Sequence, residues 1–330
     1  MTPELWVIGN LTIDDVVLPD GTTSMGMCGG NAIYAALGGR MWSDAVGLSA
    51  RIGPDFPRSH VRALDAAGVR LDLVEVQAPT LHNWALYESP DRRQFITRLD
   101  SGSHHEQSVV PDEVSVRAAS ARVCHIAPMP LERQAALVRR FAAGSPLVSL
   151  DPHDDYIAGA QDELMGVLRL VDVFLPSRGE AALLYGRDDP AAAARAFAAA
   201  GPAVVAIKLG ADGSLVLGPG LADPVSIPAV PVCTVDPTGA GDAYCGAFCV
   251  TYARTRDPLE SGLRASVAGA LTVEQHGALS ILPFDRASIR QRLSWLRQSL
   301  GRGPERGHSR ESREHPRTEN REACAWKTAS

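Results

Sequence analysis

A carboxylate follows a run of small residues late in the chain, within residues 236–248, which read DPTGAGDAYCGAF. The apolar positions after Asp242 have helical spacing, so Gly239 and Gly241 are expected at the N-terminus of a helix. Unpaired N–H groups and the positive end of the helix dipole bind anions there, and glycines let a ligand approach closely. The stretch therefore predicts an anion-binding site.

Asp242 would repel an anion bound at this helix N-terminus, so its presence needs a chemical reason. Phosphoryl transfer supplies one. A substrate hydroxyl that attacks a bound phosphoryl group must lose its proton, and Asp242 is placed to accept it. The alternative is a first-turn carboxylate that stabilises the helix by about 0.5–1 kcal/mol, and for an isolated Gly-Asp pair we would favour that alternative.

The elements that position this site alternate between strand and helix. The apolar strands RVCHIAP, LVSLDP, VDVFLPS and AVVAIKLG are separated by helical stretches such as LERQAALVRRFAAG and DPAAAARAFAAAG. This alternation indicates a parallel sheet covered on both faces. Residues 74–98 instead alternate apolar and polar side chains around the turn SPDRR, which predicts an antiparallel hairpin that could serve as a lid.

Composition and charge narrow the class of protein. The 330 residues are 45% hydrophobic and 21% charged with a net charge of -6, which fits an ordinary globular chain. No basic stripe occurs in the first 300 residues, which argues against a nucleic-acid partner. The six cysteines lack zinc-binding spacing and are expected as reduced, mostly buried thiols. No apolar segment approaches the roughly 20 residues of a membrane helix, so we expect no membrane partner and a cytoplasmic protein.

The stretch DPTGAGDAYCGAF closely resembles the C-terminal signature of the ribokinase-like (PfkB-type) carbohydrate kinases, commonly D-T-x-G-A-G-D-x-F-x-x-G. The segments GNLTIDD, GGNAIYAA, LPSRGE, IKLGADGS and QHGALSILP resemble further parts of the family in the same order. The resemblance implies a ribokinase-like three-layer α/β/α sandwich with a mostly parallel central sheet and a small β-strand lid. One domain would span residues 1–302, with the lid at about 11–28 and 74–98. Residues 303–330, rich in Arg, Glu and His, are expected to form a disordered charged tail.

The resemblance also implies roles around the anion-binding turn. Asp242 matches the family's catalytic base. The family's anion hole for the γ-phosphate corresponds to Gly239, Ala240 and Gly241. Asp236 and Thr238 match positions that, in many members, help to bind an activating monovalent cation such as K⁺. The alternative for these two residues is a turn stabilised by Asp and Pro.

On the nucleotide side, Glu180 matches an acid that organises Mg²⁺ on the phosphates of ATP through water. The alternative for Glu180 is a solvated acid at a helix start. Ser177 stands where the family usually has Asn, which leaves its contact to phosphate or metal open. Lys208 and Gly210 fall at positions near ATP, although DG is also a hairpin turn. His276 matches a segment bordering adenine and the cation, although a lone His is more often structural.

At the acceptor end, Asp14 matches the Asp that binds the sugar, with a turn acid as the alternative and Asp15 as the fallback. Gly29, Gly30 and Asn31 match the sugar-binding loop. Carboxylate and amide groups suit a polyol because each can bridge neighbouring hydroxyls. Tyr34 replaces a usual Asn, which leaves the acceptor open.

These observations favour an ATP-dependent kinase that phosphorylates a hydroxymethyl group of a neutral sugar or polyol. His153 and Asp155 replace residues typical of 2-keto-3-deoxygluconate kinases, and nearby acids disfavour an acidic sugar. A nucleoside kinase with the same chemistry is the second possibility. A non-catalytic nucleotide- or sugar-binding relative is the third, supported by Ser177 and Tyr34 but opposed by Asp242. Exposed lid edges further suggest a homodimer through the lids.

Overall fold

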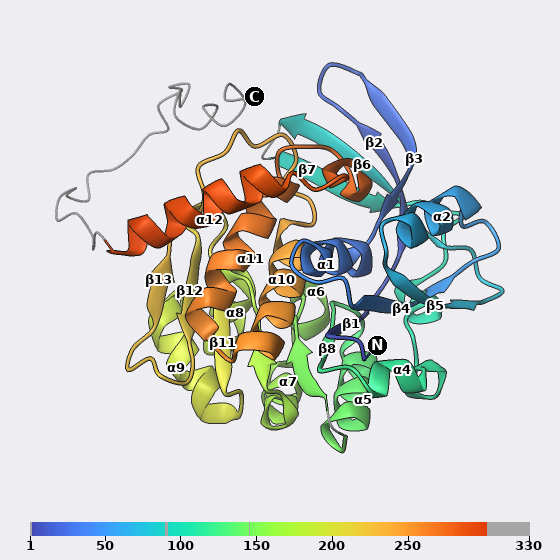
Figure 1. Cartoon of the computed structure of the whole chain (residues 1–330). Helices are drawn as coiled ribbons and strands as arrows, with labels where there is room; N and C mark the ends of the chain where they lie inside the picture. Colours follow the sequence, from blue (N-terminus) through green and yellow to red (C-terminus); the bar gives the residue numbers. More distant parts are fainter. Residues whose placement is uncertain (1, 90–91, 145, 302–330) are drawn as a thin grey trace.

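The structure is a computed structural model that describes residues 2–89, 92–144 and 146–301. A nine-stranded sheet runs through the molecule in the order β13-β12-β11-β10-β9-β8-β1-β4-β5 (Figure 1). All strand pairs from β5 to β11 are parallel, whereas β12 and β13 pair antiparallel. The strands are β1 (Leu5–Ile8), β4 (Val46–Ile52), β5 (Arg70–Glu75), β8 (Val123–Ile126), β9 (Leu147–Leu150), β10 (Val173–Phe174), β11 (Val204–Lys208), β12 (Ser214–Leu217) and β13 (Val225–Ile227).

Helices cover both faces of this sheet and enclose two hydrophobic cores. Successive residues of a strand point to opposite faces, and in β1 Leu5 and Val7 join one core while Trp6 and Ile8 join the other. The first core packs against α1 (Asn31–Arg40), α2 (Arg58–Ala66), α10 (Ala240–Thr255), α11 (Pro258–Thr272) and α12 (Arg286–Gly301). The second packs against α4 (Val116–Ala119), α5 (Leu131–Ala142), α7 (Gln161–Val167), α8 (Arg178–Tyr185) and α9 (Pro190–Ala200). The three-layer α/β/α sandwich with a mostly parallel sheet is therefore confirmed.

Local sequence signals set where several helices begin. Asp189 caps α9 by accepting a hydrogen bond of 3.0 Å from the backbone N–H of Ala192, and Pro190 occupies the first helical position. Asp257 caps α11 in the same way, and Pro258 follows it. Two short helices, α3 (His104–Gln107) and α6 (Asp154–Ile157), complete the set with the 3₁₀ turns Pro111–Glu113, Leu168–Leu170, Gly210–Asp212 and Ala278–Ile281.

A second, four-stranded sheet of order β3-β2-β6-β7 lies beside the end of the sandwich that carries α1 and α2 (Figure 1). Its strands are β2 (Thr12–Val17), β3 (Thr23–Gly29), β6 (Leu81–Ser89) and β7 (Arg92–Thr97). β2 pairs antiparallel with β3 and parallel with β6, and β6 pairs antiparallel with β7. The predicted hairpin is thus present from Leu81 onwards, but Val74 and Glu75 belong to the main sheet because they pair with Arg51 and Ile52 of β4.

The cysteines are mostly as expected. The free and buried thiols are those of Cys28, Cys124, Cys245 and Cys249. Cys233 instead takes part in a disulfide, so the expectation of reduced thiols is wrong at that position. Across the described residues no helix has both the length and the apolar character that a membrane span needs. The charged tail predicted at 303–330 lies outside the described residues.

Candidate active site

The small-residue turn ends at the start of α10, as the sequence predicts. Gly239 is the N-cap of α10 and has a φ of 74°, in the left-handed region that favours glycine. A Cβ on Gly239 would lie 2.2 Å from the ring of Tyr34, so a side chain has no room here. The N–H groups at the start of α10 have no partners within the helix, which leaves donors for an anion.

Close packing of α10 on α1 sets the position of this turn. A Cβ on Gly246 would lie 1.8 Å from the carbonyl oxygen of Ala35, and a Cβ on Gly38 would lie 2.1 Å from that of Ala243. The two helix backbones are therefore nearly in contact. This contact holds the ring of Tyr34, one residue before Ala35, against the turn.

Asp242 lies in the first turn of α10 and lines a cleft of about 140 Å³ together with Asp14 of β2. Burial raises the pKa of Asp242 to about 8, and the charges of Asp151 and Glu180 add to this effect while the ammonium of Lys208 opposes it. Once deprotonated, a carboxylate with this raised pKa is a stronger base than an ordinary aspartate, which suits a general base.

Lys208, the last residue of β11, forms a buried ion pair with Asp151, the residue that follows β9. Its Nζ donates hydrogen bonds of 2.7 Å to both carboxylate oxygens. A Cβ on Gly241 would lie 3.6 Å from this Nζ, so the ammonium is close to the turn at the start of α10. Asp151 was not selected from the sequence, although an acid directly after a parallel strand lies at the edge of the sheet where α/β proteins bind ligands.

Glu180 and Ser177 form a capping box at the start of α8. The backbone N–H of Ser177 donates to Glu180 Oε2 at 2.6 Å, and the N–H of Glu180 donates to Ser177 Oγ at 3.3 Å. Glu180 is 8% exposed, so it is not a solvated acid. Burial raises the pKa of Glu180 and the charge of Lys208 lowers it. Gly210 is exposed in the turn after β11, with a φ of 61°.

Asp236 and Thr238 meet a tyrosine from the small sheet. The hydroxyl of Tyr87 in β6 donates to Asp236 Oδ1 at 2.6 Å and lies 2.9 Å from Thr238 Oγ1. The same Oδ1 accepts the backbone N–H of Thr238 at 2.8 Å. His276 Nδ1 lies 3.6 Å from Asp236 Oδ2. Tyr87 was missed by the sequence analysis because strand pairing, and no local motif, brings it to this turn.

Asp14 is 8% exposed and faces the cleft. Its Oδ1 accepts hydrogen bonds from Thr12 Oγ1 at 3.0 Å and from Asn83 Nδ2 at 3.3 Å. Burial raises the pKa of Asp14 to about 6, and these hydrogen bonds act in the opposite direction. A Cβ on Gly29 would lie 1.8 Å from Asp14 Oδ2, so this position also needs glycine.

The fallback residue Asp15 points to the other face of β2, because adjacent strand residues alternate. It accepts hydrogen bonds from Gly26 N at 2.8 Å, His82 Nε2 at 2.9 Å and Arg98 Nη1 at 3.0 Å. Asp15 is also absent from the residues that line the cleft. Its side chain therefore ties the lid strands together, and of the two acids only Asp14 lines the cleft.

The loop before α1 completes the cleft. Gly30 has a φ of 101° and caps α1. Asn31 Oδ1 accepts the N–H of Asn10 at 2.9 Å, and Asn31 Nδ2 donates to the carbonyl of Pro128 at 2.7 Å. The Asn31 amide thus ties the backbone at Asn10 to the backbone at Pro128. Asn83 and Phe95, from the hairpin, also line it and were not selected from the sequence.

Comparison with known proteins shows which family the chain belongs to. Residues 13–285 match the pfkB family of carbohydrate kinases. The chain belongs to this family. As a PfkB-family enzyme it is an ATP-dependent kinase acting on a carbohydrate or nucleoside, and the resemblance seen in its motifs is confirmed.

Individual relatives of this PfkB-family kinase have different names. The chain is 32% identical over 278 residues to a cytidine kinase of Thermococcus kodakarensis, which covers 82% of this chain and 95% of the relative. It is 30% identical over 256 residues to a 2-dehydro-3-deoxygluconokinase of Thermoproteus tenax, covering 72% and 77%. An E. coli structure described as Ribokinase II with ATP and Mg²⁺ has a TM-score of 0.73 at 22% identity, covering 89% of this chain and 99% of that one. This last similarity supports the fold.

Proposed function

We propose that this kinase transfers the γ-phosphate of Mg-ATP to a hydroxymethyl group, with Asp242 as the base that takes the hydroxyl proton. The observation that carries the proposal is the position of Asp242. It lines the cleft that contains Asp14, and it also stands in the first turn of α10 beside the anion-binding donors. An acceptor hydroxyl bound to Asp14 and a phosphoryl group at the turn would meet next to this carboxylate.

In this proposal the anion hole consists of the backbone at Gly239, Ala240 and Gly241, and the acceptor is bound by Asp14 and the loop Gly29, Gly30 and Asn31. The nucleotide would lie on the other side of the turn, along Ser177, Lys208, Gly210 and His276. The Glu180 carboxylate is buried next to the charge of Lys208. Carboxylate oxygens suit Mg²⁺ held through water, so Glu180 fits the role of organising the metal on ATP. Bound Mg²⁺ would supply positive charge to the phosphates, while the amide donors orient the transferring group.

A monovalent cation such as K⁺ beside Asp236 and Thr238 would have to share these oxygens with Tyr87. The hydroxyl of Tyr87 already donates to Asp236 Oδ1. Activation by K⁺ is tested on its own in the assay below, by comparing the rates of ADP release with and without K⁺.

The cleft supports a neutral acceptor. Among the described residues that line it, the charged side chains are Asp14 and Asp242, and neither Lys nor Arg is present to pair with an acidic sugar. Asp14 and Asn83 offer the carboxylate and amide groups that bind vicinal hydroxyls. We therefore propose a neutral sugar or polyol, in contrast to the sugar acid in the name of the Thermoproteus relative.

A nucleoside is the second candidate acceptor. Phe95 is 46% exposed and lines the cleft with Tyr34, so aromatic surface is available next to the polyol-binding groups. A base can stack on such a ring while the ribose hydroxyls bind Asp14. The name of the Thermococcus relative, cytidine kinase, supports this alternative.

The test is release of ADP from Mg-ATP across a panel of neutral sugars, polyols, sugar acids and nucleosides, with and without K⁺, using wild type and Asp242→Asn. Turnover that needs an acceptor and is lost in Asp242→Asn supports the proposal and names the substrate class. Acceptor-dependent turnover that persists in Asp242→Asn would contradict the role of this residue. Binding of sugar or nucleotide without turnover in either protein would instead indicate the non-catalytic relative.

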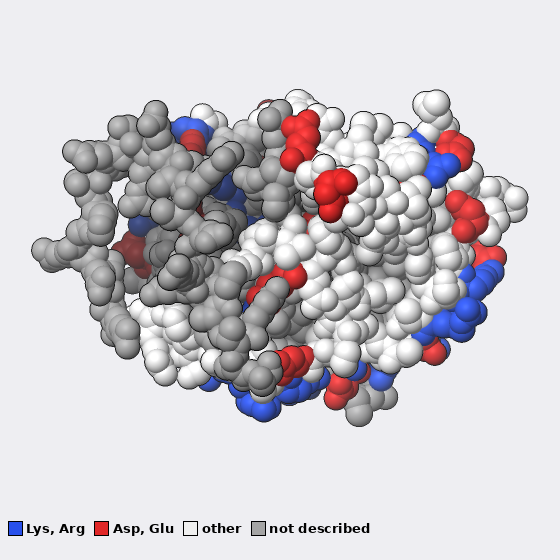
Figure 2. Space-filling model, turned by 90° about the horizontal axis from the view of Figure 1, so that it is seen from above, with Lys and Arg blue, Asp and Glu red and all other residues white. Residues whose placement is uncertain are grey.

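A homodimer through the lid also remains a proposal. The edge strands β3 and β7 carry three exposed apolar side chains, Met25, Phe95 and Ile96. The upper face of the molecule on the side of the small sheet has a broad area without charged groups (Figure 2). Sedimentation of wild type against Ile96→Asp would test it, because a lid dimer should dissociate when a charge enters its interface.

A further inference from the structure

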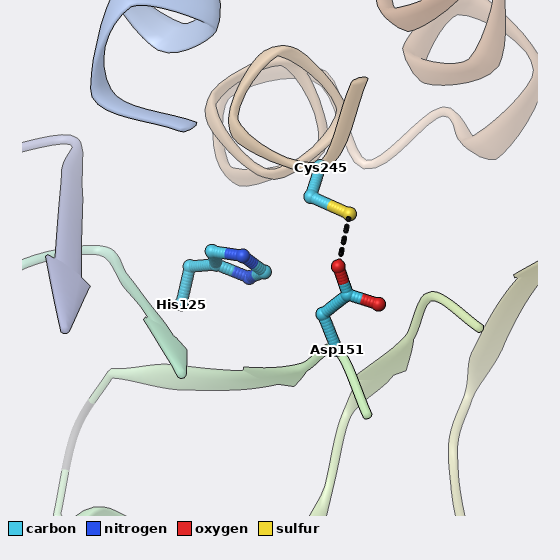
Figure 3. A group of neighbouring side chains, drawn as sticks. All are labelled: His125, Asp151 and Cys245. Atoms are coloured by element: carbon cyan, nitrogen blue, oxygen red, sulfur yellow. Dashed lines mark hydrogen bonds between the residues drawn. The ribbon is translucent and has the colours of Figure 1, made fainter. Parts of the chain in front are cut away.

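A buried group of metal-binding side chains lies directly under the anion-binding turn. His125 of β8, Asp151 after β9 and Cys245 of α10 each bring one ligand atom to within 4.8 Å of the others (Figure 3). Cys245 Sγ donates to Asp151 Oδ2 at 3.3 Å, and Cys245 stands one helical turn after Gly241. Three separate elements therefore bring a nitrogen, an oxygen and a sulfur to one point.

The environment of His125 suits a metal ligand. The residue is fully buried, and neutral imidazole is the form of histidine that binds metal ions. Nδ1 lies 3.1 Å from Ser149 Oγ, but Nε2 has no hydrogen-bond partner among the described residues. A buried polar atom without a partner is costly, and a bound ion is one arrangement that would satisfy it.

The ligand types select a particular class of metal. Imidazole, thiolate and carboxylate together suit Zn²⁺, whereas Mg²⁺ and Ca²⁺ prefer all-oxygen sites. A metal here would thus be chemically distinct from the Mg²⁺ that accompanies ATP.

The ammonium of Lys208 occupies part of the space between Asp151 and Cys245. Its Nζ is bound to both oxygens of Asp151 and lies 3.5 Å from Cys245 Sγ. A divalent cation that binds Asp151 and Cys245 must displace this ammonium, because two cations in contact repel strongly in a buried site. The side chain of Lys208 is 14% exposed, so it is not fully enclosed by protein.

We propose that His125, Asp151 and Cys245 form a binding site for Zn²⁺ and that its occupation releases Lys208 from Asp151. On binding, Zn²⁺ gains bonds to nitrogen, oxygen and sulfur, the S–H bond of Cys245 breaks, and the proton leaves to solvent without any oxidation. Since Lys208 lies beside Gly241, Zn²⁺ would also disturb the anion-binding turn and inhibit the enzyme. This inhibitory consequence, unlike the binding itself, rests on the proposed function.

The binding test uses the full chain after treatment with a chelator. Zn²⁺ content is measured after dialysis, and Co²⁺ is added in a parallel sample to detect thiolate-to-cobalt charge-transfer absorption. Cys245→Ser is compared with Cys124→Ser, a free buried thiol of β8 whose Sγ bonds to the carbonyl of Ala118 in the opposite core. We expect the absorption band in wild type and Cys124→Ser, and its loss with at least about tenfold weaker Zn²⁺ binding in Cys245→Ser.

Lys208→Met keeps the test decisive if Cys245→Ser does not fold. Removing the competing ammonium should tighten Zn²⁺ binding, an effect that loss of folding cannot imitate. No Zn²⁺ retention by wild type, equal binding by Cys245→Ser, or weaker binding by Lys208→Met would each overturn the proposal. The binding measurements need no kinase activity, so failure of the metal site and failure of the proposed function can be told apart.

Discussion

The hydroxyl of Tyr87, in lid strand β6, donates a hydrogen bond of 2.6 Å to Asp236 Oδ1 in the segment that leads to the turn at the start of α10. Asp236 is 3% exposed, and its Oδ1 also fixes the backbone of Thr238. The lid is therefore joined to the turn by a buried hydrogen bond. In the proposed function, this contact would couple acceptor binding on the lid side to phosphate binding at the turn.

Replacing Tyr87 with Phe should affect turnover more than acceptor binding. The variant loses the hydrogen bond at a cost of about 1–2 kcal/mol but keeps the ring, so we expect a fall in kcat of about tenfold with a smaller change in KM. Steady-state kinetics with an acceptor identified by the substrate panel would measure both constants. Tyr185→Phe, on α8 and away from the residues that line the cleft, is the matched control. A Tyr87→Phe enzyme with unchanged kcat would show that the contact does not position the turn.

The raised pKa of Asp242 predicts the pH profile. A general base must be deprotonated, and burial raises the pKa of this group to about 8, so kcat/KM should increase with pH and level off above roughly pH 8. Asp14, with a pKa raised to about 6, loses its proton earlier and does not limit this range. Lys208→Met removes a charge that lowers the pKa of Asp242, so its profile should shift to higher pH. A profile that is flat between pH 6 and 9 would rule out Asp242 as the titrating base.

The Lys208–Asp151 pair predicts a pattern of stability. Asp151→Asn leaves a buried ammonium without its partner, which should lower the free energy of unfolding by about 3–5 kcal/mol. Lys208→Met combined with Asp151→Asn removes the stranded charge and should recover a large part of this loss. Denaturant unfolding of the single and double variants gives the comparison. If the loss of stability in the double variant equals or exceeds the sum of the two single losses, the two charges do not interact as the structure indicates.

The sequence predicts those parts of the site that depend on local backbone requirements. The turn at Gly239 and the acid at Asp242 follow from a motif at a helix start, and Gly29 follows Asp14 within one hairpin. Asn83 could not be predicted in the same way, because it reaches Asp14 through the parallel pairing of β2 with β6, in which the two residues are opposite each other. Long-range pairing of this kind has no local sequence signal.

The contrast between local motifs and long-range pairing also applies to the residues proposed to lie near the nucleotide. Asp151 and Lys208 are 57 residues apart in the chain and meet because β9 and β11 both flank β10. Ser177 matches the position of a family Asn, yet its hydroxyl accepts a hydrogen bond from the N–H of Glu180 and caps α8. A motif match gives the place of a side chain but not the partner that the fold provides for it.

The close contact between Gly239 and the ring of Tyr34 can be tested by stability measurements that need no kinase activity. Gly239→Ala would force a Cβ into the ring of Tyr34 at a residue with a φ of 74°, so both the clash and the backbone conformation disfavour it. We expect a loss of about 1–3 kcal/mol in the free energy of unfolding together with loss of activity. Gly179→Ala, in the first turn of α8 with no atom within 4 Å of the added Cβ, should instead be neutral or slightly stabilising. Thermal unfolding of both variants decides the point, because equal stability of the two proteins would mean that Tyr34 moves away and that the turn is not fixed by this contact.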